Sequence, residues 1–69
     1  MMHMEGEIVR DLNRGRYVKV MRIRAHYTDR AGWRSRALLM DNDAVLQWSD
    51  VADIVGPFST EKFEGQDHA

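Results

Sequence analysis

The segment from Tyr17 to Tyr27 constrains the fold of this chain more than any other feature. It is rich in β-branched and aromatic residues, contains neither proline nor glycine, and alternates in polarity, which predicts a long β-strand. Its buried-type side chains change parity, from even positions at Val18 and Val20 to odd positions from Met21 onward. This change predicts a β-bulge near Val20 or a first half that is covered on both faces.

A return strand is expected directly after this segment. Thr28 to Gly32 has the composition of a hairpin loop, with glycine where a positive φ is usually needed, and Trp33 to Met40 follows as the second strand. Pairing Tyr27 with Trp33 gives one apolar face, and a slip of one residue would turn arginines toward the core. The expected pairs on that face are Tyr27 with Trp33, Ala25 with Ser35, Ile23 with Ala37, and Met21 with Leu39.

Shorter elements are expected on both sides of this hairpin. Turn residues and short apolar runs mark their limits. The expected elements are a strand at Gly6–Leu12, turns at Asn13–Gly15 and Asp41–Asp43, a strand at Ala44–Trp48 with Leu46 and Trp48 facing the core, a helical turn at Ser49–Asp53 capped by Ser49, and a closing strand at Ile54–Val55 ended by Gly56-Pro57.

Residues 44–55 have a second interpretation. Ala44, Trp48, Val51 and Val55 fall on one stripe of a helix, so the segment also fits one amphipathic helix. The sequence leaves the choice between a helix and a strand-turn-strand arrangement open, and we prefer the latter.

The pattern predicts an all-β fold with about five short strands and one helical turn before the last strand. In strand count, although not in any sequence motif, it resembles a small SH3-like or Sm-like barrel. We assign residues 6–58 to this single domain. Residues 1–5 are interpreted as a disordered N-terminus of the kind that a cloning remnant leaves, and residues 59–69 as a flexible acidic tail.

Composition limits the function classes. The chain has 69 residues and no cysteine, so it can form neither disulfides nor thiolate metal sites, and self-association is the expected aid to stability. His26 is the one histidine outside the predicted termini, and no group of side chains has metal-ligand or catalytic spacing. We therefore expect a cytoplasmic, non-enzymatic domain without cofactor, metal or membrane segment.

Charge is distributed unevenly along the chain. Residues 1–36 contain nine cationic side chains and four carboxylates, a net charge of +5, whereas residues 37–69 contain one and seven, a net charge of −6. This asymmetry indicates either an anionic partner for the first half or pairing between the halves.

The hairpin register predicts a basic face. Arg24 is expected opposite Arg36 and His26 opposite Arg34, and like charges across a ladder are unfavourable unless an anion compensates them. Arginine binds phosphate with two parallel hydrogen bonds, and aromatic rings can stack on bases. The predicted contact residues for nucleic acid or an acidic protein surface are Arg22, Arg24, His26, Arg34 and Arg36, with Tyr17, Tyr27 and Trp33 as stacking or anchoring residues.

Two further interpretations stay open. The basic side chains may only form a solvated face neutralised by Asp50, Asp53 or Glu7. Alternatively, the chain is a protein-interaction adaptor or inhibitor that acts as a homo-oligomer, of the small stand-alone kind common in phages and mobile elements. Aromatic residues and arginine are enriched at the hot spots of such interfaces.

Overall fold

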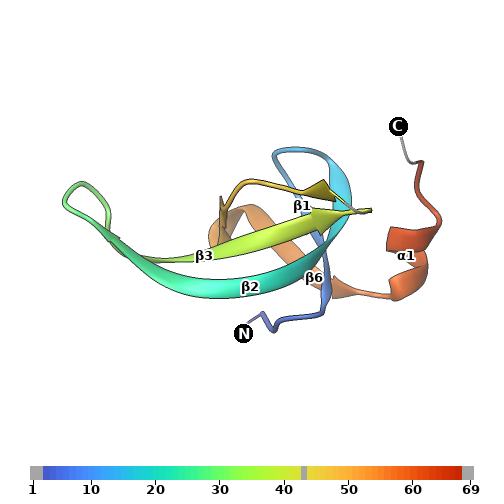
Figure 1. Cartoon of the computed structure of the whole chain (residues 1–69), viewed down its shortest axis with the longest axis horizontal. Coiled ribbons are helices and arrows are strands. Elements are labelled where there is room, and N and C mark those ends of the chain that lie inside the picture. The colour runs from blue at the N-terminus through green and yellow to red at the C-terminus, as the bar shows by residue number, and fades with distance from the viewer. Residues whose placement is uncertain (1–2, 43, 68–69) are drawn as a thin grey trace.

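The chain folds into one antiparallel sheet with a short C-terminal helix (Figure 1). A computed structural model describes residues 3–42 and 44–67. The sheet order is β4-β3-β2-β1-β6, and β5 also pairs with β3. The elements are β1 (Ile8–Asp11), β2 (Arg16–Thr28), β3 (Gly32–Asp41), β4 (Ala44–Val45), β5 (Ser49–Asp50), the 3₁₀ turn η1 (Val51–Asp53), β6 (Ile54–Phe58) and α1 (Thr60–Glu64).

The predicted β-rich class and the helical turn before the last strand are both confirmed. The sheet is open, however, because β6 pairs with β1 and no hydrogen-bonded ladder joins it to β3, β4 or β5 within the described part of the chain. A closed barrel is therefore not established by the strand pairing.

The long hairpin has the predicted register over most of its length. Tyr27 pairs with Trp33, and the ladder continues in the same register to the pair of Ile23 with Ala37. The register then shifts between Val20 and Arg22, which confirms the β-bulge. The expected pairing of Met21 with Leu39 is wrong, because the extra residue of the bulge brings Val20 opposite Leu39.

The bulge explains how one face of β2 serves the core despite the change of parity. Val18 and Val20 before it are buried, and Ile23 after it packs against the same cluster. One inserted residue reverses the alternation, so even positions face inward before the bulge and odd positions face inward after it. The buried apolar side chains are Ile8, Val9, Val18, Val20, Ala37, Leu39 and Ile54.

Beyond the core, β2 and β3 project as a two-stranded ribbon that tapers to the loop at Asp29–Ala31 (Figure 1). We call residues 24–36 the arm. Strand β1 pairs with β2 only as far as Lys19, and β5 pairs with β3 only at the base of the arm, at Arg36 and Ala37. Most of the arm is therefore exposed on both faces, and the molecule measures 39 × 24 × 17 Å.

The segment that follows β3 differs from both sequence interpretations. The alternative of one helix over residues 44–55 is wrong, because these residues contain β4, β5, η1 and the start of β6. The preferred strand at Ala44–Trp48 shrinks to Ala44–Val45. Leu46 packs against the core as expected, but Trp48 is 39% exposed and does not belong to it.

Two details of the closing segment are also corrected. Asp50, rather than Ser49, caps η1, since its side chain accepts a hydrogen bond from the amide of Ala52, whereas Ser49 lies in β5 and is buried. Strand β6 does not stop at Gly56 but continues to Phe58. A side chain at Gly56 would meet the carbonyl oxygen of Ile8 at 3.0 Å, so glycine permits the close approach of β1 and β6.

Helix α1 was not expected from the sequence. It contacts β1 and β2, and Lys19 lies over the ring of Phe63 at 5.9 Å from its centroid. Met1, Met2, Asp43 and the last two residues lie outside the described residues, so the turn prediction at Asp43 and the terminal predictions there are not addressed. No helix in the described chain has the length and apolar character needed to cross a membrane.

Candidate binding site on the hairpin arm

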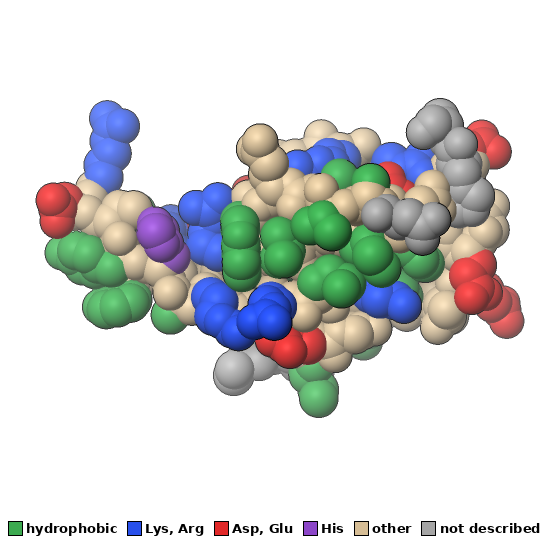
Figure 2. All heavy atoms as spheres, viewed as in Figure 1, with side chains coloured by type: hydrophobic (Ala, Val, Ile, Leu, Met, Phe, Trp, Pro, Cys, Tyr) green, Lys and Arg blue, Asp and Glu red, His purple; other side chains and the backbone are tan. Residues whose placement is uncertain are grey.

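Four of the five predicted basic residues meet on one face at the base and middle of the arm. Arg24 is the cross-strand partner of Arg36, and His26 is the partner of Arg34. Directly paired residues of an antiparallel ladder share a face, so the structure places these side chains together. Arg22 pairs with Leu38 beside the bulge and is exposed. Figure 2 shows Lys, Arg and His side chains gathered along the arm.

Strand β5 adds two residues to the same face. Ser49 pairs with the buried Ala37 and is itself buried, so its neighbours Trp48 and Asp50 are turned toward the face that carries Arg36. The result is a pocket of about 370 Å³ at the base of the arm. Its lining residues are Arg24, Ala25, His26, Arg36 and Trp48.

Asp50 neutralises one of the arginines. Its carboxylate forms an ion pair with the Nε of Arg34 and also accepts a hydrogen bond from the amide of Ala52 at 2.9 Å. The hydrogen bond from Arg34, followed by that from Ala52, lowers the pKa of Asp50. The same carboxylate raises the pKa of Arg34. The interpretation that an acidic residue offsets the basic face therefore holds for this pair.

Arg36 is held differently. Its Nη2 donates a hydrogen bond to the carbonyl oxygen of Trp48 at 3.0 Å, which fixes the backbone of Trp48 beside the arm. Its Nε is buried and has no hydrogen-bond partner among the described residues. A buried donor without an acceptor is costly, so an acceptor supplied from outside would be favourable here.

The remaining arginines of this face are weakly compensated. Arg24 lies 3.5 Å from a carboxylate oxygen of Glu5, but both side chains are 55% exposed, so the ion pair contributes little. Arg22 and His26 form no ion pair within the described chain. Arg22, Arg24, Arg34 and Arg36 thus outnumber the two adjacent carboxylates, Glu5 and Asp50, and the face carries a net positive charge.

The predicted aromatic residues are divided between two regions. Tyr27 and Trp33 lie together near the tip, with ring centroids 5.4 Å apart and exposed fractions of 53% and 73%. They occupy odd positions and therefore face away from Arg24 and His26. Tyr17 is ten residues away along β2 and packs against Phe58 with ring centroids 5.2 Å apart, so the structure does not bring it to the arm.

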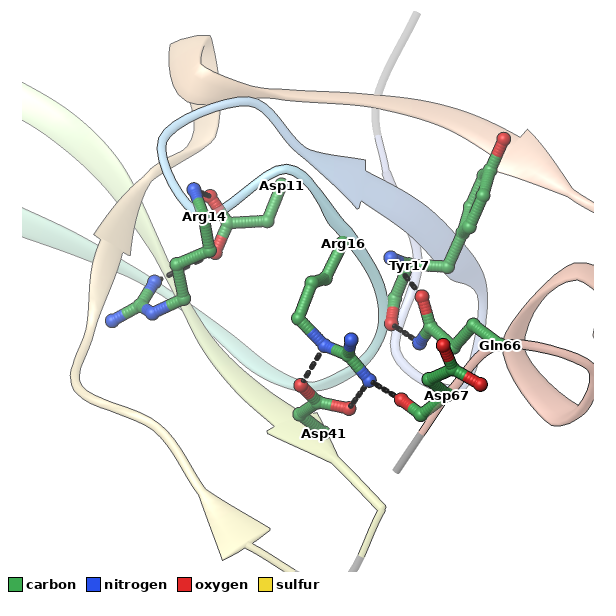
Figure 3. Close-up of polar contacts among 7 residues, drawn as sticks. All are labelled: Asp11, Arg14, Arg16, Tyr17, Asp41, Gln66 and Asp67. Atoms are coloured by element: carbon green, nitrogen blue, oxygen red, sulfur yellow. Dashed lines mark hydrogen bonds and ion pairs between the residues drawn. The ribbon is translucent and has the colours of Figure 1, made fainter. Parts of the chain in front are cut away.

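Cations at the opposite end of the sheet bind to the chain itself (Figure 3). Arg14 pairs with the fully buried Asp11 at 2.6 Å. The Nε of Arg16 lies 2.5 Å from Asp41, and this hydrogen bond raises the pKa of Arg16. Beside them, the backbone of Tyr17 exchanges two hydrogen bonds with the side chain of Gln66. These contacts indicate a structural role for the cations here.

Sequence reasoning missed the position of Trp48 on the basic face. Its only signal is the pairing of Ser49 with Ala37, which depends on the path of the chain between β4 and β5 and leaves no periodic trace in two residues. Among residues 3–42 and 44–67, no cluster of three or more histidine or acidic side chains could hold a metal ion. Comparisons with protein families, curated proteins and solved structures gave no match.

Proposed function

We propose that this chain is a non-enzymatic binding module that contacts nucleic acid with the basic face of its arm. The observation that carries the proposal is the cross-strand pair of Arg24 and Arg36, two like charges that line one open pocket. Such a pair destabilises the free protein, and a phosphate between the two guanidinium groups would relieve the repulsion.

The shape of the arm supports the same proposal. A two-stranded ribbon has little stability of its own in water, and here the core supports only its base. A projecting ribbon can follow a nucleic-acid backbone or enter a groove, as β-ribbon readers do. The exposed pair of Tyr27 and Trp33 near the tip adds apolar surface that the chain itself leaves uncovered.

Fluorescence anisotropy with short labelled RNA and DNA tests the proposal. At low salt the protein should bind, and affinity should fall steeply as salt rises, because phosphate contacts release counterions. Arg24→Glu should weaken binding about tenfold or more, since it reverses a charge at a phosphate contact. Lys62→Glu is the matched control, because Lys62 is exposed on α1 at the other end of the molecule. No binding at low salt, or equal losses in both variants, would refute the proposal.

A protein-interaction adaptor is the second candidate, and the exposed tip favours it. Trp33 is 73% exposed and stands beside Tyr27, and both are residue types common at interface hot spots. A second copy is the simplest partner, because its acidic half could meet the arm. Sedimentation at several protein and salt concentrations tests this: a dimer that dissociates as salt rises supports it, and a monomer at high concentration opposes it.

We also propose that the open sheet is an incompletely closed version of a small SH3-like barrel. Strand β1 pairs with both β2 and β6, and η1 connects β5 to β6, which is the arrangement expected near the closing point of such a barrel. The amide of Leu12 also donates to the carbonyl of Asp53, which ties the β1–β2 turn to η1. Nuclear Overhauser contacts between β5 and β6 in solution would support closure, and their absence would oppose it.

A further inference from the structure

Only one exposed aromatic ring shares a face with the arginines of the arm. Tyr27 and Trp33 lie on the other face, and Tyr17 lies at the far end of β2. Trp48 lines the same pocket as Arg24 and Arg36 and is 39% exposed. If the basic face binds a strand of nucleic acid, the ring available for a base beside the phosphate contacts is therefore that of Trp48.

We infer that the pocket at the base of the arm binds one nucleotide of a single-stranded nucleic acid, with its base stacked on Trp48 and its phosphate held by Arg24 and Arg36. This inference rests on the proposed function and names the subsite within it. It corrects the sequence prediction, which assigned stacking to Tyr17, Tyr27 and Trp33.

The geometry of the pocket fits an anion beside a planar ring. Its volume of about 370 Å³ falls within the range of sites that bind small molecules. Arg36 and Arg24 come from adjacent strands, so their guanidinium groups can approach one phosphate from two sides. The buried Nε of Arg36 still lacks an acceptor, and a phosphate oxygen brought in by a small shift of this side chain would supply it.

Trp48 is positioned for stacking by its backbone. The hydrogen bond from Arg36 reaches the carbonyl oxygen of Trp48 and leaves the indole free. Pairing of Ser49 with Ala37 then anchors the next residue to the core. The ring is thus held at a defined place without being buried, which lowers the entropic cost of stacking a base on it.

A single strand fits this site better than a duplex. Stacking on a protein ring requires a base whose flat face is uncovered, and the bases of a duplex cover one another. Base-to-aromatic stacking tolerates any sequence, because every base has such a face. We therefore expect little base preference and tighter binding of single-stranded RNA or DNA than of the corresponding duplex.

The test uses the two tryptophans as separate reporters. Trp33→Phe leaves Trp48 as the only indole, and Trp48→Phe leaves Trp33. Each variant is titrated with an unlabelled single-stranded oligonucleotide, in ribose and deoxyribose forms, while tryptophan emission is recorded. Stacking should quench Trp48 strongly and Trp33 weakly. In parallel, Trp48→Ala should weaken binding about five- to a hundredfold, and Trp33→Ala should weaken it much less.

The outcomes separate this inference from the proposed function. Quenching of Trp33 alone, or an unchanged affinity in Trp48→Ala, would overturn the stacking site while leaving nucleic-acid binding intact. Equal quenching by duplex and single strand would also overturn it. No change in anisotropy for the wild type with any oligonucleotide would instead remove the proposed function. Circular dichroism of each variant confirms that the fold is retained, and Trp48→Phe provides a milder substitution if Trp48→Ala unfolds.

Discussion

Arg24 lies directly across the β2–β3 ladder from Arg36, and both side chains line the pocket at the base of the arm. The two are not equivalent. Arg36 is fixed by its hydrogen bond to the carbonyl of Trp48, whereas Arg24 is more than half exposed and pairs loosely with Glu5. Arg24 can therefore be replaced with little structural loss, which makes it the better position for testing the pair.

Arg24→Gln should stabilise the free protein and weaken nucleic-acid binding. It removes the repulsion with Arg36, and the exposed ion pair to Glu5 that it also removes contributes little. We expect the free energy of unfolding to rise by about 0.5 kcal/mol, the scale of a cross-strand charge pair. Urea denaturation and anisotropy measure the two effects, with Lys62→Gln as control. A loss of stability with unchanged binding would contradict this account.

Asp50→Asn should strengthen binding, because it releases Arg34 from its ion pair and adds one net positive charge to the face. Asparagine can still accept the hydrogen bond from the amide of Ala52, so η1 should remain capped. Asp50→Ala removes both the charge and the cap, and should cost about 1 kcal/mol more in stability. Anisotropy and thermal denaturation of both variants separate charge from capping. Weaker binding by Asp50→Asn would show that the ion pair organises the face.

The pKa of Asp50 predicts the pH range in which this pair acts. Arg34 and the amide of Ala52 lower that pKa in the folded protein, so the folded state binds the proton less well than the unfolded state. The stabilisation is therefore fully present above the ordinary aspartate pKa of about 4 and is lost as the pH falls through the lowered folded value. Carbon-13 NMR titration of the carboxyl group should show the low midpoint, and Arg34→Gln should raise it. An unshifted midpoint would exclude the ion pair in solution.

Asp11→Ala should destabilise the fold although it lies far from the arm. The carboxylate is fully buried, accepts from the amides of Asn13 and Arg14 at 3.1 and 3.3 Å, and pairs with the Arg14 guanidinium. Its loss leaves those donors without an acceptor, and we expect a cost of about 2 kcal/mol. Urea denaturation measures it, with the exposed Glu61→Ala as control. Asp11→Asn keeps the turn acceptor and should lose less. Equal stability of Asp11→Ala and wild type would contradict the role of this contact.

Leu38 and Leu39 test which face of β3 meets the core. Leu39 is fully buried opposite Val20, whereas Leu38 is only partly buried opposite Arg22. Leu39→Ala should lower the free energy of unfolding by about 2–5 kcal/mol, because it leaves a cavity, and Leu38→Ala should cost much less. The two variants have the same composition, so their difference reports position alone. Similar losses would place the bulge incorrectly.

The sequence alone determined the long hairpin, its loop, its register near the tip and the bulge. These features are local: alternation along Tyr17–Tyr27 and Trp33–Met40 assigns each side chain to a face, and the reversal after Val20 requires one extra residue. A wrong register would expose Ile23 and bury arginines, so the pattern permits few alternatives. The gathering of Arg24, His26, Arg34 and Arg36 was predicted for the same reason.

Tertiary structure decided which residues outside the hairpin join that face. Strand β5 has two residues and no measurable period, so only its pairing with β3 turns Ser49 inward and Trp48 and Asp50 outward. The projection of the arm likewise depends on where β1 and β5 stop pairing, which local pattern does not encode. Alternation assigns a side chain to one of two faces, but the position of a short strand is set by loop path and packing, and these arise only in the folded chain.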